Sequence, residues 1–497
     1  MPTDHEKAWR MKDHWKTMIA MTLVSLSSFQ YGLDFGIIGG LQAMVPFLEV
    51  FGRKDPSTPL GYNISSERQQ LIASFMVLGA FVSSSSAGFT AKYVGRKLSL
   101  WIACVGVFLS TALMQATTNI GGLYAGRLII GLANGLLMTH SQLYDSGSLI
   151  GTIVDNFAAK ITTRSAYITP LGVVHIVPGI LFIGLFFIPE SPRWLAAKGD
   201  FEKAEQALQW LRPQGWAVAR ELEEMRTTLE AEAQLQSSTG YLDLFKNPID
   251  RRRTTVAVLA LTSLAASGAM YIISYGTYFF EMASVGKAFE NSCILTGVGV
   301  AALLAAALLI TKFGRRRLMM LIGFALCGLS QLVIAVVYTV QPNTQNSGKV
   351  LVGMSVFYIA AYNALVAPYA WLSGGELSSQ RLRSHTFGLA TGVGFLFAWL
   401  TTFTAPYFIN PDALNWGPKY GYIWTGSSAI AGIWIFFFLP EVKDRTLEEI
   451  DEMFEAEVPA RKFRKYRCTG SHPVLDEKAQ TEYIERTSNG KDENAKV

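Results

Sequence analysis

Long runs of apolar residues, separated by short polar connections, make up most of the chain. Eleven of these runs are long enough for a helix to cross a hydrocarbon core about 30 Å thick, which takes roughly 20 residues. They occupy residues 17–41, 71–90, 98–113, 121–138, 167–187, 255–280, 294–310, 318–340, 350–372, 387–408 and 421–439. The pattern predicts an all-α membrane protein whose helices cross the bilayer many times.

A twelfth apolar run, residues 147–157, is too short to span the bilayer. Eleven residues at a helical rise of 1.5 Å reach only ~17 Å, about half of the hydrocarbon core. The stretch THSQLYDSGSLIG, residues 139–151, leads into this run without a proper polar loop. If the crossing were absent, the rest of the chain would be inverted across the membrane. The sequence therefore predicts a truncated fifth span within a nominal set of twelve.

Composition and charge exclude several other classes of protein. Half of the residues are hydrophobic and 16% are charged, which is typical of an integral membrane protein. The net charge of +5 is concentrated in particular connecting loops, so it does not indicate a nucleic-acid partner. The four cysteines have no metal-ligand or disulfide spacing. No nucleophile–base set or phosphate loop indicates an enzyme, and no cofactor or metal is expected.

The distribution of basic residues predicts the orientation and the division of the chain. Lys and Arg are enriched in alternate loops, which places both termini in the cytoplasm. We expect a cytoplasmic N-terminus (1–16), a membrane bundle (17–189), an amphipathic helical linker (190–254), a second bundle (255–440) and a cytoplasmic tail (441–497) that is disordered after about residue 466. Asn63-Ile64-Ser65 in the first outer loop matches a glycosylation sequon.

The two bundles share landmarks at corresponding positions. GFTAKYVGRK after the second span is echoed by LLITKFGRRR after the eighth, and PESPRWL after the sixth is echoed by PEVKDRTLEEIDEMF after the last. Together with GRLIIG and GELSSQRLR, these motifs resemble the sugar porter family of the major facilitator superfamily, especially its fungal members. The resemblance covers roughly residues 10–466. It implies two six-helix halves related by an internal repeat.

The repeat also indicates what the short fifth span lacks. Gly95 to Pro189 spans 94 residues, whereas the equivalent stretch from Gly314 to Pro440 spans 126. The resemblance implies a charged cytoplasmic loop and a substrate-facing Gln at the position where Tyr144 is followed directly by Asp145. Three explanations stay open: a coding sequence that lost an exon or had an intron over-assigned, a degenerate paralogue without transport activity, and a functional protein with rearranged fourth and fifth helices.

Asp34 is the only acidic residue in the first span, and Arg127 in the fourth span is its natural partner. A carboxylate at membrane depth is costly unless it is paired or functional. A nearby arginine favours the charged carboxylate and desolvation favours the neutral one, so movement of the arginine could toggle protonation. The resemblance assigns this pair to proton coupling. The alternative is a static ion pair that fixes helix packing.

Charged residues at the cytoplasmic ends of the spans match the inner salt-bridge network of the family. Such a network closes the cytoplasmic side in one state and opens in the other. The alternative is that these charges only set the topology. The matching residues are Arg96, Glu190, Arg193, Arg315, Glu376, Arg383 and Glu441.

Substrate contacts are expected mainly from the seventh and tenth spans, because sugars are bound by hydrogen-bonding side chains and aromatic faces. Trp371 matches the tenth-span tryptophan of the family, while Tyr271, Ser274 and Tyr275 are candidate cavity residues. An aromatic stripe with helical spacing more often serves packing than sugar binding. The paired glutamines of the family are replaced here by Leu264 and Ala265, so the substrate is not an ordinary hexose or binding is lost.

These observations predict a multi-pass plasma-membrane carrier of a hexose, pentose, disaccharide or polyol. Transport would proceed by alternating access, with proton symport. Its partners are a small sugar-like molecule, a proton and the lipid bilayer, and nothing in the sequence indicates an oligomeric state. The alternatives are a nutrient sensor without transport activity, a degenerate paralogue and a carrier of a quinate-like acid.

Overall fold

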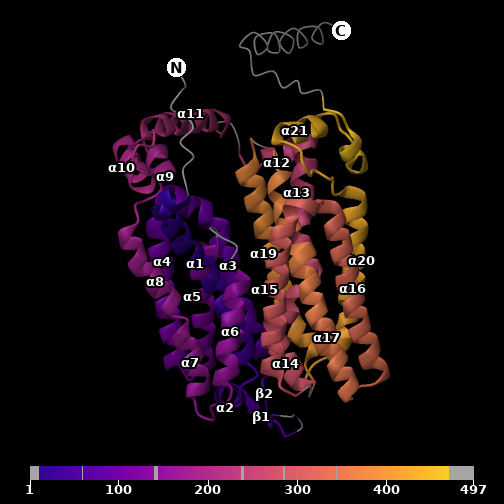
Figure 1. Cartoon of the computed structure of the whole chain (residues 1–497). Coiled ribbons are helices and arrows are strands. Elements are labelled where there is room, and N and C mark those ends of the chain that lie inside the picture. The colour runs from indigo at the N-terminus through magenta and orange to yellow at the C-terminus, as the bar shows by residue number, and fades with distance from the viewer. Residues whose placement is uncertain are drawn as a thin grey trace, which may run out of the picture.

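The computed structural model describes residues 11–56, 58, 60–138, 144–236, 240–283, 286–342, 344–379 and 381–468. The tail predicted to be disordered falls largely beyond residue 468, outside the described residues, and so do residues 139–143 at the questioned junction. The chain forms two helical bundles that lie side by side (Figure 1). The fold class predicted from the apolar pattern is confirmed.

The two ends of the molecule differ in what they carry (Figure 1). One end, here named the linker end, carries the helices α9 (Pro192–Ala197), α10 (Phe201–Leu211), α11 (Val218–Gln236), α12 (Asp243–Lys246) and α21 (Leu447–Glu455). The opposite end, the hairpin end, carries α2 (Val45–Phe51) and the antiparallel strands β1 (Arg53–Lys54) and β2 (Tyr62–Asn63).

The first bundle contains the helices predicted from the first apolar runs. They are α1 (Trp15–Leu41), α3 (Ser66–Tyr93), α4 (Arg96–Ala116), α5 (Ile120–Met138), α6 (Tyr144–Ala158), α7 (Ser165–Val173) and α8 (Ile176–Phe187). The predicted span 167–187 is divided between α7 and α8. Pro178 in the first turn of α8 has no backbone N–H to donate to the carbonyl of Val174, which explains a break at this point.

The second bundle also has interrupted spans. Its helices are α13 (Pro248–Ala266), α14 (Ala269–Met282), α15 (Ala288–Phe313), α16 (Arg316–Val340), α17 (Gln345–Ala361), the π-turn η2 (Tyr362–Val366), α18 (Ala367–Glu376), α19 (Arg383–Ile409), the 3₁₀ turn η3 (Gly417–Tyr420) and α20 (Gly421–Phe438). Gly268 has a φ of 85° and separates α13 from α14, because a left-handed residue cannot continue the helix. Pro368 lacks the N–H that would bond to the carbonyl of Ala364, and the π-turn precedes it.

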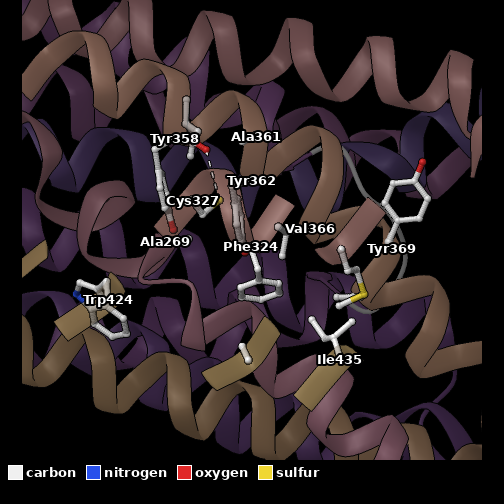
Figure 2. Close-up of a cluster of buried hydrophobic side chains, with 14 of the residues drawn as sticks. Ala269, Phe324, Cys327, Tyr358, Ala361, Tyr362, Val366, Tyr369, Trp424 and Ile435 are labelled. Atoms are coloured by element: carbon white, nitrogen blue, oxygen red, sulfur yellow. Dashed lines mark hydrogen bonds between the residues drawn. The ribbon is translucent and has the colours of Figure 1, made fainter. Parts of the chain in front are cut away.

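Each bundle has its own apolar core. In the second bundle, Tyr358 and Tyr362 stack with ring centroids 6.2 Å apart, close to Phe324 and Cys327 of α16 (Figure 2). The Tyr358 hydroxyl donates to the carbonyl of Ser267 over 2.9 Å. That carbonyl lies where α13 ends, so the buried hydroxyl satisfies a group that the helix break leaves without an intrahelical partner.

The bundles meet along three pairs of elements. α3 lies along α19, α6 lies along α15, and α14 packs against α1. Among the described residues, nine helical segments are long and apolar enough to cross a membrane, and α1 with the bent α2 adds a tenth. α3 and α6 fall outside this set. α3, with 28 residues, is long enough to cross, whereas α6 has only 15 residues, about 22 Å at helical rise.

α6 accompanies only part of α1. Gly147, near the start of α6, lies against Phe29 in the middle of α1, and Asp155 near its other end lies against Gly40. The half of α1 toward the linker end therefore has no α6 beside it. On that half Met18 and Met21 are 43% and 65% exposed, and on the corresponding half of α15 Leu308 is 79% exposed. The fifth segment is thus short in the structure, as the apolar pattern predicted.

Candidate functional site

Asp34 and Arg127 form a buried ion pair inside the first bundle. One guanidinium nitrogen, Nη1 of Arg127, donates to both carboxylate oxygens of Asp34 over 3.0 Å. Both side chains are 1% exposed. Nε of Arg127 donates to the carbonyl of Ile72 over 2.9 Å, so the arginine ties α1 and α5 to α3. The partnership expected from the sequence is present.

A cavity with a mixed polar and apolar lining lies between the two bundles, beside Gly36 and Gly39 of α1. Its lining combines small residues with hydroxyl and amide side chains, namely Gly36, Gly39, Ser148, Thr152, Gly276, Thr277, Ser292, Thr296, Gly299 and Asn363, with the apolar Ile272, Ile273, Leu295 and Ile359. The hydroxyls form pairs: Thr152 with Thr296 at 2.9 Å, and Thr277 with Ser292 at 2.8 Å.

The residues expected to contact substrate are not gathered around this cavity. Tyr271 donates its hydroxyl to Oε1 of Gln331 over 2.8 Å and stacks on Trp424 inside the second bundle. Tyr275 donates to the carbonyl of Thr402 over 2.8 Å and is fully buried. Both tyrosines therefore serve packing in this conformation, the alternative considered from the aromatic spacing.

Ser274 and Trp371 also lie off the cavity lining. Ser274 is 1% exposed, on a turn of α14 whose carbonyl approaches Gly39 of α1. Trp371 is half-buried in α18, and its ring centroid lies 6.1 Å from that of Phe387. Substrate contact at these two positions therefore stays a prediction.

Polar contacts join the two bundles at the hairpin end. The Tyr278 hydroxyl of α14 donates to Oδ1 of Asn63 over 3.0 Å, and Asn410 donates to Oε1 of Gln69 over 2.7 Å. Asp412 accepts hydrogen bonds from both the backbone and the hydroxyl of Ser66. The hairpin end is therefore closed by contacts between the bundles.

Asn63, the residue of the predicted glycosylation sequon, is enclosed at the hairpin end in this conformation. Its side chain is 1% exposed, and its amide oxygen accepts hydrogen bonds from the backbone of Ile64 and from Tyr278. A glycan on the amide nitrogen would need space that the closed hairpin end fills. Glycosylation of this sequon stays a prediction, and the local sequence could not reveal that Asn63 is enclosed.

Two glutamates of the expected inner network occupy equivalent positions in the two bundles. Glu190 accepts from the backbone N–H of Lys97 at 3.1 and 3.2 Å, at the start of α4. Glu441 accepts from the backbone N–H groups of Arg316 and Arg317 at 3.1 and 3.2 Å, at the start of α16. Each carboxylate thus caps a helix N-terminus, where unpaired N–H groups and the helix dipole favour negative charge.

The arginine that pairs with Glu376 is Arg316, which corrects the expectation for Arg315. Arg316 donates Nε and Nη2 to the two oxygens of Glu376 over 3.0 and 2.7 Å. Arg315 is exposed and precedes the first turn of α16. The triplet Arg315-Arg316-Arg317 does not by itself reveal which member faces the neighbouring helix.

The remaining members of the expected network lie at three separate places. Arg96, Arg193 and Arg383 are exposed, at the start of α4, in α9 and at the start of α19. The cap at Glu190 stays within the first bundle, and the cluster around Glu376 and Glu441 stays within the second. Among the described residues, these two caps and the Arg316–Glu376 pair are thus internal to each bundle, whereas the polar contacts at the hairpin end join the two.

Comparison with known proteins identifies the family. A family model described as "Sugar (and other) transporter" matches residues 20–146 and 136–454. The chain belongs to this family. The two matched segments overlap at residues 136–146, the junction between α5 and α6.

Among curated proteins, the transporter is 28% identical to the major facilitator-type transporter ecdD of Aspergillus rugulosus, over 97% of this chain and 96% of that protein. It is 28% identical to the maltose permease MAL31 of Saccharomyces cerevisiae, over 91% and 78% of the two chains. The high glucose sensor RGT2 of the same yeast is 26% identical over 89% of this chain and 61% of its own length.

Among solved structures, the inward open conformation of the xylose transporter XylE from E. coli superposes with a TM-score of 0.70 at 18% identity, covering 87% of this chain and 99% of that one. XylE bound to 6-bromo-6-deoxy-D-glucose gives a TM-score of 0.68 at 19% identity, covering 88% and 98%. At this level of identity the likeness establishes the major facilitator fold of the chain.

Three residues of the transporter's charged and buried framework were not singled out from the sequence. They are Arg316, Lys97 and Asp155. Asp155 is 1% exposed in α6, with Oδ2 packed on Gly40 of α1. Asp155 could have been singled out from the sequence, because an acidic residue inside the apolar run 147–157 is as unusual as Asp34 in the first span.

Proposed function

We propose that the protein carries a sugar across the membrane by alternating access, with Asp34 as the carboxylate that couples transport to a proton. The observation that carries the proposal is the Asp34–Arg127 pair, whose two side chains are 1% exposed and 3.0 Å apart. Arginine keeps its charge inside a protein, so protonation of Asp34 would leave Arg127 as an uncompensated buried cation. Proton binding and helix rearrangement are thereby linked.

The arrangement of the bundles supports an inward-facing state. Asn410 and Gln69, Asn63 and Tyr278, and Ser66 and Asp412 join the bundles at the hairpin end. We assign the hairpin end to the extracellular side of the plasma membrane and the linker end, with both termini, to the cytoplasm. The concentration of Lys and Arg near the linker end supports this orientation.

The cavity favours a polyhydroxylated substrate. Ser148, Thr152, Thr296 and Asn363 offer hydroxyl and amide groups that can exchange hydrogen bonds with sugar hydroxyls. Among the described residues, no charged side chain belongs to the cavity lining, which argues against a quinate-like acid. Xylose, glucose and maltose are the substrates to test first, because they represent the sugars named for relatives and structural neighbours.

Uptake into vesicles with and without an imposed proton gradient tests the coupling. We expect Asp34→Asn to abolish accumulation against a sugar gradient while retaining exchange of internal and external sugar. Asp34→Asn leaves the buried Arg127 cation without a charged partner. The double variant Asp34→Asn/Arg127→Gln therefore provides a second test in which neither charge remains. Gradient-driven accumulation equal to the unmodified protein in both variants would refute the coupling role.

A non-transporting sensor is the second candidate function. The observation that favours it is the short α6, which leaves the linker-end halves of α1 and α15 uncovered. A carrier that alternates between two states would be expected to enclose its substrate path on this side too. Sugar binding measured by protein fluorescence, together with no uptake in vesicles, would favour the sensor. Binding with uptake would favour the carrier.

A further inference from the structure

A run of basic side chains follows α21 at the linker end. Arg461, Lys462, Arg464, Lys465 and Arg467 are all exposed, and within the described residues none of them forms an ion pair with a carboxylate. We name residues 461–467 the basic segment. It includes most of the 3₁₀ turn η4 (Ala460–Lys465).

This lack of carboxylate partners distinguishes the basic segment from the linker helices. There Lys203 pairs with Asp200 at 2.6 Å, Arg220 with Glu224 at 2.9 Å, and Arg226 with Glu230 at 2.9 Å. Charges on an ordinary solvated face are interspersed in this way. Five neighbouring cations that form no ion pair with a carboxylate repel one another, and an external anion would relieve this repulsion.

Contacts with α20 place the basic segment at the membrane surface. The Arg461 guanidinium lies 4.4 and 4.3 Å from the ring centroids of Phe436 and Phe437 in the last turn of α20. Those rings are 45% and 50% exposed, so in a bilayer they face lipid. Phe463 is buried, and its ring centroid lies 5.1 Å from that of Phe454 in α21. This contact holds the basic segment against the linker end of the second bundle.

A second arginine shares the Phe436 ring. The Arg317 guanidinium lies 5.3 Å from that ring centroid and donates Nη2 to the Phe436 carbonyl. Its Nε is buried and has no hydrogen-bond acceptor among the described residues. The adjacent carboxylate, Glu441, is occupied by the backbone N–H groups of α16. A guanidinium donor is therefore left over beside Arg461.

We propose that the basic segment and Arg317 bind the phosphate headgroup of an anionic phospholipid. Guanidinium groups match phosphate oxygens in geometry and charge. The ligand is a lipid rather than a soluble phosphate, because the cations border rings that face the acyl chains and one molecule can satisfy both surfaces. The site is independent of sugar transport and goes beyond the proposed function.

Thermal unfolding of the full-length protein in neutral detergent tests the site. Phosphatidylserine and phosphatidylcholine are titrated separately into the unmodified protein, into Arg461→Gln/Arg464→Gln/Lys465→Gln, and into a matched control, Lys203→Gln/Arg220→Gln/Arg226→Gln. Both triple variants remove three exposed positive charges. We expect phosphatidylserine to raise the midpoint of the unmodified protein and the control at similar concentrations. The basic-segment variant should need about 100-fold more lipid, at a factor of roughly five per basic residue.

Each other outcome contradicts the proposal. Equal weakening in the control would indicate a general charge effect, and equal stabilisation by phosphatidylcholine would indicate no headgroup recognition. The same stabilisation by inorganic phosphate at equal concentration would indicate a soluble anion. Arg464→Gln/Lys465→Gln keeps the Arg461 contacts with Phe436 and Phe437, so it tests the site if the triple variant fails to fold. An unchanged phosphatidylserine response in this double variant would overturn the assignment.

Discussion

The two bundles are built on the same plan but differ at the linker end. In the second bundle, Glu441 caps α16 and Arg316 forms a bidentate pair with Glu376, at the end of a broken helix that runs from Gln345 to Glu376. In the first bundle, Glu190 caps α4 in the same way. There Lys97 occupies the position equivalent to Arg316 and donates Nζ to the carbonyl of Ile188 over 2.8 Å.

This difference separates local from long-range determinants of the charged cluster. The caps depend on a Pro-Glu pair that both halves possess, at Pro189-Glu190 and Pro440-Glu441. The ion pair also needs an acid at the end of a further span. Glu376 supplies this acid in the second bundle, and the first bundle is 32 residues shorter over the equivalent stretch from Gly95 to Pro189. At the linker end the second bundle therefore has both a helix cap and an ion pair, whereas the first bundle has only the cap.

Sequencing the transcript across the codons for Tyr144 and Asp145 has the largest expected effect on the comparison between the two bundles. We expect roughly two dozen additional codons, enough for a polar loop and a span of about 20 residues. They would extend α6 along the uncovered half of α1 and restore an acid opposite Lys97. Reads that join the two codons directly would make the asymmetry a property of the protein and would favour the non-transporting alternatives.

Gly147→Ala should be the most disruptive single substitution in the short helix. An added Cβ would lie 2.0 Å from the carbonyl oxygen of Phe29. This oxygen belongs to the backbone of α1, so relieving the clash would require the helix itself to shift. We expect a loss of about 1–3 kcal/mol, measured as a lower unfolding midpoint. Gly394→Ala in α19 is the matched control, since its Cβ would lie 3.7 Å from the Leu261 carbonyl oxygen. Equal losses would contradict the tight packing of α6 on α1.

Glu376→Gln should affect the second bundle more than any equivalent change affects the first. It leaves the Arg316 guanidinium, whose side chain is 16% exposed, without its charged partner. We expect a cost of about 1–3 kcal/mol. Lys97→Gln loses a hydrogen bond to a carbonyl and a cation–π contact with the Trp101 ring at 5.2 Å, and should cost about 1 kcal/mol. The unfolding midpoints of the two variants are measured side by side. A lower midpoint for Lys97→Gln than for Glu376→Gln would contradict the stronger role of the charged pair in the second bundle.

The two caps should be equivalent to each other. Glu190→Gln and Glu441→Gln each keep an oxygen acceptor but remove the negative charge at a helix N-terminus. We expect each to cost about 1 kcal/mol or less, with the two values within about 0.5 kcal/mol. A large difference in unfolding midpoint between them would show that the capped positions are not equivalent.

The smallest expected effect is a pH dependence in the linker, outside both bundles. Hydrogen bonds from Arg212 lower the pKa of Glu221 below its usual range, with a further contribution from Trp216. A lowered pKa means that this pair stabilises the linker above the unfolded pKa of about 4.3 and stops doing so as the pH falls through the folded pKa. Glu221→Gln should flatten the stability profile below pH 5 by less than about 1 kcal/mol, measured by circular dichroism.

Much of the fold followed from the sequence because apolar periodicity and length determine which segments can lie in a bilayer. The eleven long runs all coincide with helices or broken helices, and the short run 147–157 falls within α6. Asp34 and Arg127 could be paired from the sequence, because isolated charges in apolar spans have few possible partners. The resemblance to sugar porters added the capping glutamates Glu190 and Glu441.

The remaining site residues depended on side-chain direction. Arg315 and Arg316 are neighbours, and only the docking of α16 on α18 decides which guanidinium meets Glu376. Tyr271 and Tyr275 fit a binding stripe by spacing, yet their hydroxyls bond to Gln331 and to the Thr402 carbonyl. Helical spacing gives the face of a helix but not which neighbour covers that face.

The sequence by itself determined that this protein lives in a membrane, that it is a duplicated helical bundle, and that its fifth span is short. These properties follow from free energies of transfer into lipid, which add along the chain and need no knowledge of distant contacts. Only the tertiary structure decided that the bundles meet at the hairpin end, that Asn63 is enclosed there, and that hydroxyl pairs such as Thr152 and Thr296 line the cavity. These features depend on segments more than 100 residues apart in the chain, whose approach is set by the packing of whole helices.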